Sequence, residues 1–227
     1  MNRAILLCAA AATALTLSAC NKNQATGNST PADTNATTDT NATPGQSTPI
    51  NKAQDAAGAA VGSMSAATMG SHDTGAFVTS LVRGNMYELD AAKIAEQKAK
   101  SPDVKKFAKQ MITDHTKLGA EAKPVIAKAG QTPPTDLDQR LKGMLDNLKA
   151  ASAADFDKTY MDQQVAAHDE TLTLLQGYAK DGSDADLKAL ASKATPVVQH
   201  HDDMAKSLQA KVAGGSQGAN NAGTANP

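Results

Sequence analysis

The sequence predicts an all-α fold, a bundle of four long helices with an additional short helix between the second and the third. Two observations support this prediction. Apolar residues recur at steps of three and four over long stretches, and no stretch alternates with a period of two. Clusters of glycine and proline divide these stretches into segments of helical length.

Residues 1–19 are predicted to be a lipoprotein signal peptide. A basic start precedes an apolar run from Ala4 to Leu17, which is too short to span a membrane. Residues 17–20, Leu-Ser-Ala-Cys, resemble a bacterial lipobox, in which Cys20 is the residue that receives lipid. Asn21 resembles the outer-membrane default of such lipoproteins. The alternative is a plain signal peptide that is cut after another small residue.

Low-complexity sequence flanks the helical region on both sides. Residues 20–72 are rich in Asn, Thr, Ala, Ser, Gly and Pro and lack aromatic residues, which predicts a lipid-attached, disordered tether. Gly58 and Gly62 disfavour a stable helix within it. Residues 213–227 are predicted to be a disordered tail. The bundle is therefore expected over residues 73–212, which are enough for a single core.

The first two long helices have clear boundaries. The first is predicted over residues 74–100, after which Ser101 provides an N-cap and Pro102 occupies the first helical position of the next helix. The second helix extends to residue 130. Pro124 inside it is expected to remove one backbone hydrogen bond.

The remaining elements follow a proline-containing break. A short amphipathic helix is predicted at 136–150, and Ser152 with Asp155 resembles a capping box that begins the third long helix. The third helix ends near Gly182, and the fourth runs from Leu187 with a regular apolar spacing.

The two halves of the helical region resemble each other, since residues 101–108 are echoed by residues 185–191. Two similar hairpins joined by the crossing segment 131–152 predict a ferritin-like four-helix bundle with pseudo-twofold symmetry. A simple up-down-up-down bundle, with 136–150 as a fifth helix, is the alternative.

Each long helix carries one ionisable residue on its apolar stripe, namely Glu88, His115, His168 and His201. Burying such groups costs several kcal/mol unless they find partners, so we expect either a shared ligand or a closed hydrogen-bond network. Three imidazoles and a carboxylate suit a single transition-metal ion, such as zinc, iron, manganese or copper. No Glu-x-x-His motif precedes these histidines, which argues against a ferroxidase-type di-iron centre.

A buried network is the competing interpretation of the same residues. In it, Glu88 and His115 form an ion pair and other polar side chains satisfy the rest. Residue counts from the hairpin turns place Glu88 and His115 at the same height. The same counts separate His168 from His201 by about 7 Å along the bundle axis.

Several motifs together resemble one known family. They are Tyr87-Glu88-Leu89, Met-Ile-Thr-Asp-His at residues 111–115, Ala-Asp-Phe-Asp-Lys-Thr-Tyr at residues 154–160, His168, and His201 followed by Met-Ala-Lys at residues 204–206. With them, the run from Phe77 to Lys206 resembles the domain of unknown function 4142 family (DUF4142), a ferritin-like group of bacterial envelope proteins. The resemblance implies a fold and a cellular location, and it implies no reaction.

Composition limits the functional classes. The formal net charge is −1, there is no tryptophan, and basic residues alternate with acidic ones, which argues against a nucleic-acid partner. The sequence contains no Ser/His/Asp set, no phosphate-binding glycine loop and no CxxC motif, so no catalytic residue is predicted. We therefore expect a non-enzymatic outer-membrane lipoprotein that faces the periplasm or the cell surface. It would be attached to the membrane through Cys20 and serve a structural, interaction or stress-related role with another envelope protein. The alternatives are a periplasmic metal-binding or metal-dependent redox protein and an enzyme without metal that uses Glu88 as a base.

Overall fold

The computed structural model describes residues 49–68 and 72–220, and the side chains of 53–67 and 72–214. These residues form helices and no strand. The helices are α1 (Pro49–Thr68), α2 (Thr74–Lys98), α3 (Pro102–Lys128), α4 (Gln139–Ala150), α5 (Phe156–Asp181) and α6 (Ala185–Asn220). The predicted signal peptide, the predicted lipid site Cys20 and the first part of the predicted tether lie outside the described residues.

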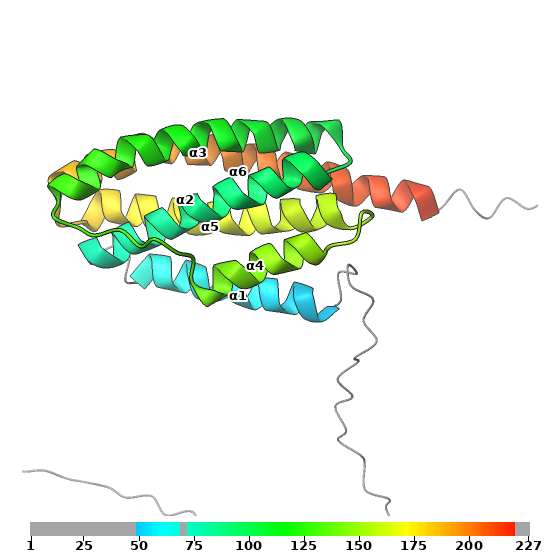
Figure 1. Cartoon of the computed structure of the whole chain (residues 1–227), viewed down its shortest axis with the longest axis horizontal. Coiled ribbons are helices and arrows are strands. Elements are labelled where there is room, and N and C mark those ends of the chain that lie inside the picture. The colour runs from blue at the N-terminus through cyan, green and yellow to red at the C-terminus, as the bar shows by residue number, and fades with distance from the viewer. Residues whose placement is uncertain (1–48, 69–71, 221–227) are drawn as a thin grey trace, which may run out of the picture. The chain divides into compact units, whose positions relative to one another are not determined.

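Four of these helices, α2, α3, α5 and α6, form a bundle made of two antiparallel hairpins, α2–α3 and α5–α6 (Figure 1). The connection that contains α4 runs back along the bundle, so α3 and α5 run in the same direction. The predicted all-helical bundle with a short helix in the crossover is thereby confirmed. Its closer likeness to ferritin stays a prediction.

Helix ends follow the signals in the sequence. The Ser101 hydroxyl accepts a hydrogen bond from the amide of Val104 at 3.4 Å, as the predicted N-cap requires. The Asp73 and Asp138 side chains cap α2 and α4 in the same way. Gly130 follows α3 with a φ of 68°, a left-handed conformation that glycine adopts without strain. Pro124 lies inside α3, which continues through it.

The core consists of two apolar clusters with a polar layer between them. One cluster contains Tyr87, Phe107, Met111 and Tyr160 and extends to the buried face of α4. The other contains Phe77, Ile126, Leu175, Tyr178 and Leu187. Along α3, α5 and α6, the buried His115, His168 and His201 lie between residues of the two clusters, and the buried Glu88 lies next to Tyr87 on α2. The three histidines therefore form a single polar layer, without the offset between His168 and His201 that the residue counts suggested.

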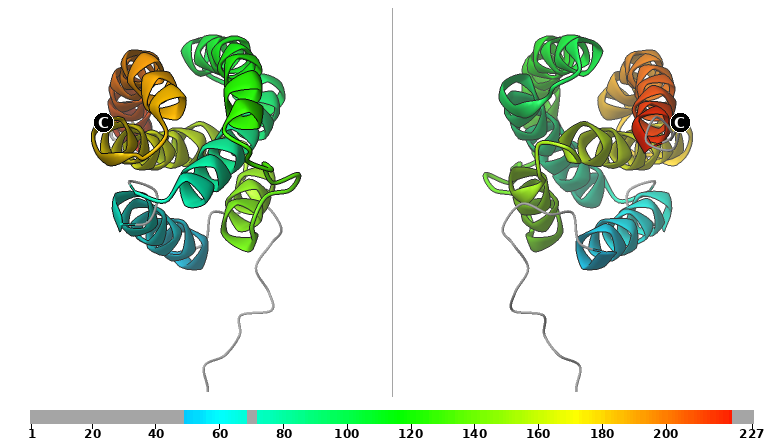
Figure 2. Two further views of the ribbon diagram at one scale, coloured as in Figure 1. Left: turned by 90° about the vertical axis from the view of Figure 1, so that its left-hand side faces the viewer. Right: turned by 90° about the vertical axis from the view of Figure 1, so that its right-hand side faces the viewer.

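The structure differs from the predicted tether over residues 49–68, which form α1. This helix packs on α5 and α4 on one side of the bundle (Figure 2). The two glycines that argued against a helix allow its close approach. A Cβ atom on Gly62 would lie 2.0 Å from Oε2 of Glu170, and one on Gly58 would lie 3.2 Å from Cγ of Arg140. Alanine-rich sequence around them supplies the helix propensity.

The helix α6 continues to Asn220, so it includes the first residues of the predicted disordered tail, 213–227. Extending an existing helix requires no new nucleation step, which favours this continuation. None of the described helices combines the length and apolar character needed to cross a membrane.

The attachment of α1 depends on Asp55, and its loss is expected to free the helix. The Asp55 carboxylate accepts hydrogen bonds from Asn147 and Gln163, both at 2.8 Å. We expect Asp55→Ala to destabilise the docked position of α1 by at least about 1.5–3 kcal/mol, because a single hydrogen bond to a charged group contributes about that much. Amide hydrogen exchange should accelerate across α1 while α2, α3, α5 and α6 stay protected. Gln54→Ala, at an exposed position of α1, is the control. Equal exchange in Asp55→Ala and wild type would mean that other contacts hold α1.

Candidate metal centre in the bundle core

Three of the four predicted polar residues meet in the polar layer. His115 of α3, His168 of α5 and His201 of α6 are all buried. Their ring centroids lie 6.0 Å apart for His115 and His168, 5.5 Å for His115 and His201, and 5.6 Å for His168 and His201. One nitrogen from each ring lies within 4.8 Å of the corresponding nitrogens of the other two.

The meeting of His168 and His201 removes the offset that the sequence suggested. In the structure, α5 ends at Asp181 and α6 begins at Ala185, so the two Cα positions differ by only three residues, or about 4.5 Å along the axis. Helical side chains lean toward the N-terminus of their own helix. In an antiparallel pair His201 therefore leans toward the turn and His168 leans away from it, which brings the rings to one height.

The outer nitrogen of each ring has a fixed partner. His115 Nδ1 lies 3.0 Å from Oδ1 of Asn85, and His168 Nδ1 lies 2.7 Å from the backbone oxygen of Gln164. His201 Nε2 lies 2.8 Å from Oδ2 of Asp114. Because all three partners are acceptors, each outer nitrogen carries the proton and donates. The tautomer of every ring is thereby determined.

The inner nitrogen of each ring is therefore unprotonated, and no hydrogen-bond donor among the described residues reaches its lone pair. His115 Nε2, His168 Nε2 and His201 Nδ1 are buried and have no hydrogen-bond partner among the described residues. Three acceptors cannot hydrogen-bond to one another. A buried polar atom without a partner costs about 1–3 kcal/mol, so three of them at one point form an incomplete site.

The electrostatics keep these rings neutral. Burial lowers the pKa of His115 well below its ordinary value, and the neighbouring His168 and His201 add to this effect. Burial also lowers the pKa of His168 to about 4. Burial lowers the pKa of His201 although its hydrogen bond to Asp114 opposes the shift. Neutral imidazole is the form that coordinates a metal ion.

Glu88 is buried next to this cluster but does not join it. Its Oε2 accepts a hydrogen bond from Nε2 of Gln164 at 2.7 Å, and its Oε1 lies 3.8 Å from Nδ1 of His168 with no hydrogen-bond partner among the described residues. Burial raises the pKa of Glu88 to about 8. The predicted ion pair with His115 is not formed, since His115 bonds to Asn85 instead.

The sequence did not identify the groups that orient the rings. Asn85 and Asp114 act across helix interfaces, so no spacing within one helix reveals them, whereas the Gln164 carbonyl lies one turn before His168 on the same helix. Asp114 keeps its charge because hydrogen bonds from Gln110 and His201 lower its pKa, although burial opposes this. Asp202 is also buried, and it accepts a hydrogen bond from Lys206 at 2.7 Å.

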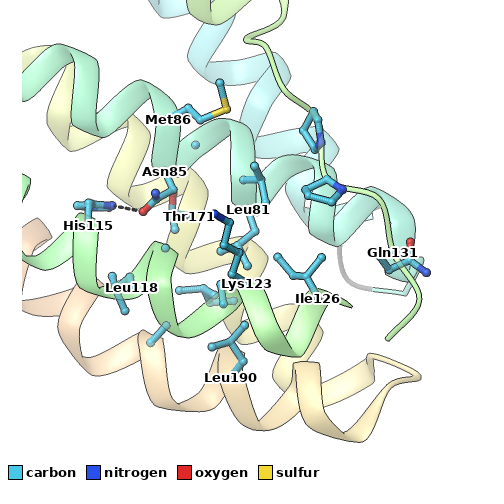
Figure 3. A pocket seen from close by; sticks show the side chains of 18 of the residues that line it. Leu81, Asn85, Met86, His115, Leu118, Lys123, Ile126, Gln131, Thr171 and Leu190 are labelled. Atoms are coloured by element: carbon cyan, nitrogen blue, oxygen red, sulfur yellow. Dashed lines mark hydrogen bonds between the residues drawn. The ribbon is translucent and has the colours of Figure 1, made fainter. Parts of the chain in front are cut away.

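Two cavities approach the polar layer from different sides. The larger, of about 450 Å³, is mostly apolar and reaches His115 and Asn85 (Figure 3). At about 24 cal/mol per Å³, a closed void of about 450 Å³ would cost on the order of 10 kcal/mol, as much as the whole stability of a domain. Exposed lining residues such as Lys123 and Thr135 show that it is open at one side. The smaller cavity, of about 360 Å³, lies beside α1 and reaches Glu88.

Comparison with known proteins identifies the family of this chain but does not indicate an activity. No curated protein matches the chain, and no solved structure matches it. The model of the domain of unknown function DUF4142 matches residues 59–208, a range that starts inside α1 and includes every polar residue of the cluster. The chain therefore belongs to the DUF4142 family.

Proposed function

We propose that this protein binds one divalent first-row transition-metal ion through His115, His168 and His201. The observation that supports the proposal is the meeting of three buried lone pairs, each on a ring whose other nitrogen is already held. Metal-binding histidines ordinarily have such an outer partner, which sets the tautomer and makes the inner nitrogen more basic. Asn85, the Gln164 carbonyl and Asp114 fill this role.

A water molecule fits this arrangement less well than a cation. One water donates two hydrogen bonds, so at least one of the three lone pairs would stay unsatisfied. A metal ion accepts all three. Ligand nitrogens about 2.0–2.1 Å from a tetrahedral ion lie roughly 3.4 Å apart. Small ring rotations from separations within 4.8 Å reach that geometry.

The donor set narrows the choice of metal. Imidazole nitrogens suit zinc, copper, iron and nickel, whereas manganese and magnesium prefer carboxylates and water. Because Glu88 does not share the cluster, the set lacks an oxygen ligand and manganese becomes the weakest of the predicted metals. Three protein ligands leave one position of a tetrahedral ion open to a small ligand.

The location of this site in the cell is a second proposal. We propose that Cys20 carries lipid and holds the domain at the outer membrane, facing the periplasm or the cell surface, where an envelope protein is its partner. The support is the lipobox-like sequence at residues 17–20 behind a short apolar run.

Elemental analysis tests the metal proposal. Protein purified without chelators from its native envelope should contain close to one equivalent of a single transition metal. His115→Ala, His168→Ala and His201→Ala should each lower that content by at least tenfold, because two remaining imidazoles hold an ion far more weakly. Metal content by mass spectrometry, with circular dichroism as a check on folding, gives the result.

Exposed histidines provide the matched control for this experiment. His200→Ala, at the position before His201, should retain the metal, as should His72→Ala. Asp114→Ala should weaken affinity by about 10–100-fold, the usual effect of removing the outer partner of a ligand. Metal-free wild type that takes up no ion on titration, or equal metal in all variants, would contradict the proposal.

Glu88 predicts a pH dependence in the metal-free protein. Its pKa is about 8 when folded against an ordinary 4.5, so the folded state binds more protons between these values and its stability falls as pH rises. The lowered histidine pKa values act below about 6.5, where stability falls as pH decreases. From pH 6.5 to 8, Glu88 should therefore remove roughly 2 kcal/mol of unfolding free energy. Urea unfolding should show this loss in wild type and not in Glu88→Gln, and parallel curves would exclude the assignment.

Lipid attachment is testable with a single substitution. Labelled palmitate should enter the wild-type chain in cells, and the protein should sediment with outer membranes. Cys20→Ala should remove both the label and the sedimentation, because no other cysteine follows the apolar run. Cys8→Ala, inside the predicted signal, should change neither. Membrane attachment that survives in Cys20→Ala would contradict the lipobox assignment.

A further inference from the structure

The larger cavity has the chemistry of a ligand site in its own right. Its walls come from α2, α3, α5 and α6 and from the loop that follows α3. Figure 3 shows Leu81, Leu118, Ile126 and Leu190 along it, with His115 and Asn85 at one end. Its volume of about 450 Å³ lies in the range of small-molecule sites, which are mostly apolar with a few polar groups.

The cavity is long. Its lining residues on α3 extend from His115 to Ala127, twelve residues of continuous helix and about 18 Å along the axis. Leucine and isoleucine side chains face it along that length. This form suits a flexible chain better than a compact ring system.

The lining of the larger cavity contains one charged side chain, that of Lys123. Among the described residues that line the cavity, Lys123 is the only one whose side chain is charged at neutral pH, since His115 is neutral and no Asp, Glu or Arg is among them. Its side chain extends from α3 over the cavity (Figure 3). Lys123 is exposed and forms no ion pair within the described part of the chain. An anionic group beside it would therefore complete a charge pair that the protein itself leaves open.

We propose that this cavity binds a monoanionic amphiphile with one acyl chain, a fatty acid, with its chain among the leucines and its carboxylate at Lys123. Burial of the chain supplies the affinity, and the lysine selects an anion over a neutral or cationic analogue. The proposal goes beyond metal binding and does not depend on it, since none of its contacts requires an ion at the histidines.

Calorimetric titration of the full chain with dodecanoate, below its micelle concentration and in the presence of chelator, tests the binding. Wild type should bind one equivalent. Ala122→Phe on α3 and Ala194→Phe on α6, both in the cavity lining, should each weaken binding at least tenfold by filling the cavity. Because one of them could disturb packing, folding is checked by circular dichroism and metal uptake is measured in parallel. Absence of saturable binding, or binding that both variants retain, would overturn the proposal.

A pair of charge-reversal variants tests whether the carboxylate of the ligand binds at Lys123. Lys123→Glu should weaken dodecanoate binding about tenfold and leave binding of the neutral 1-dodecanol unchanged. Lys109→Glu, an exposed position of α3 outside the cavity lining, is the control with the same change of charge. Equal losses in the two variants would show only a general charge effect and would refute a carboxylate site at Lys123. Concentration-dependent dimerisation that Ala122→Phe abolishes, without dodecanoate binding, would assign the cavity to a second copy of the chain instead.

Discussion

The structure depends on one constraint, the burial of three neutral imidazoles at a single level of the bundle. Each ring is fixed by an acceptor on its outer side, and each inner nitrogen is left without a partner among the described residues. At about 1–3 kcal/mol for each unsatisfied atom, the metal-free site costs several kcal/mol, a large share of the 5–15 kcal/mol that a domain has in total. A ligand that satisfies all three nitrogens would return that energy to the folded state, so site occupancy and stability are coupled.

The burial of the polar residues was predictable from the sequence because it depends on spacing within single helices, whereas the residue counts wrongly set His168 and His201 about 7 Å apart along the axis. Glu88, His115, His168 and His201 each lie on an apolar stripe, and all four are buried in one layer. What the sequence could not give was the direction of each side chain around the bundle. Glu88 turns toward Gln164 and lies beside His168, and it leaves the three histidines to converge without it. Asn85 and Asp114, which orient His115 and His201, come from other helices, and pairing across helices has no signature in one sequence.

The helix α1 shows a different limit of sequence reasoning. Glycine lowers helix propensity by up to about 1 kcal/mol per residue, which made residues 49–68 resemble a tether. In the folded chain, a Cβ atom at Gly62 would overlap the Glu170 carboxylate, and one at Gly58 would make a tight contact with the Arg140 side chain. Propensity is a property of the isolated segment, whereas the close packing of α1 on α5 belongs to the tertiary structure. The family match, which begins at residue 59, includes part of this helix and agrees with its belonging to the domain.

The placement of the candidate ligands also determines what an ion would do to the bundle. His115 comes from the hairpin α2–α3, while His168 and His201 come from the hairpin α5–α6. An ion held by all three would therefore cross-link the two hairpins at the one level where apolar packing is interrupted. The outer partner of His115 is on α2 and that of His201 is on α3, so the same ion would fix the orientation of side chains on all four bundle helices. Because each ring is already held by its outer hydrogen bond, only small ring rotations would be needed to reach the ion, and a site whose geometry is set by four helices would discriminate among metals by that geometry.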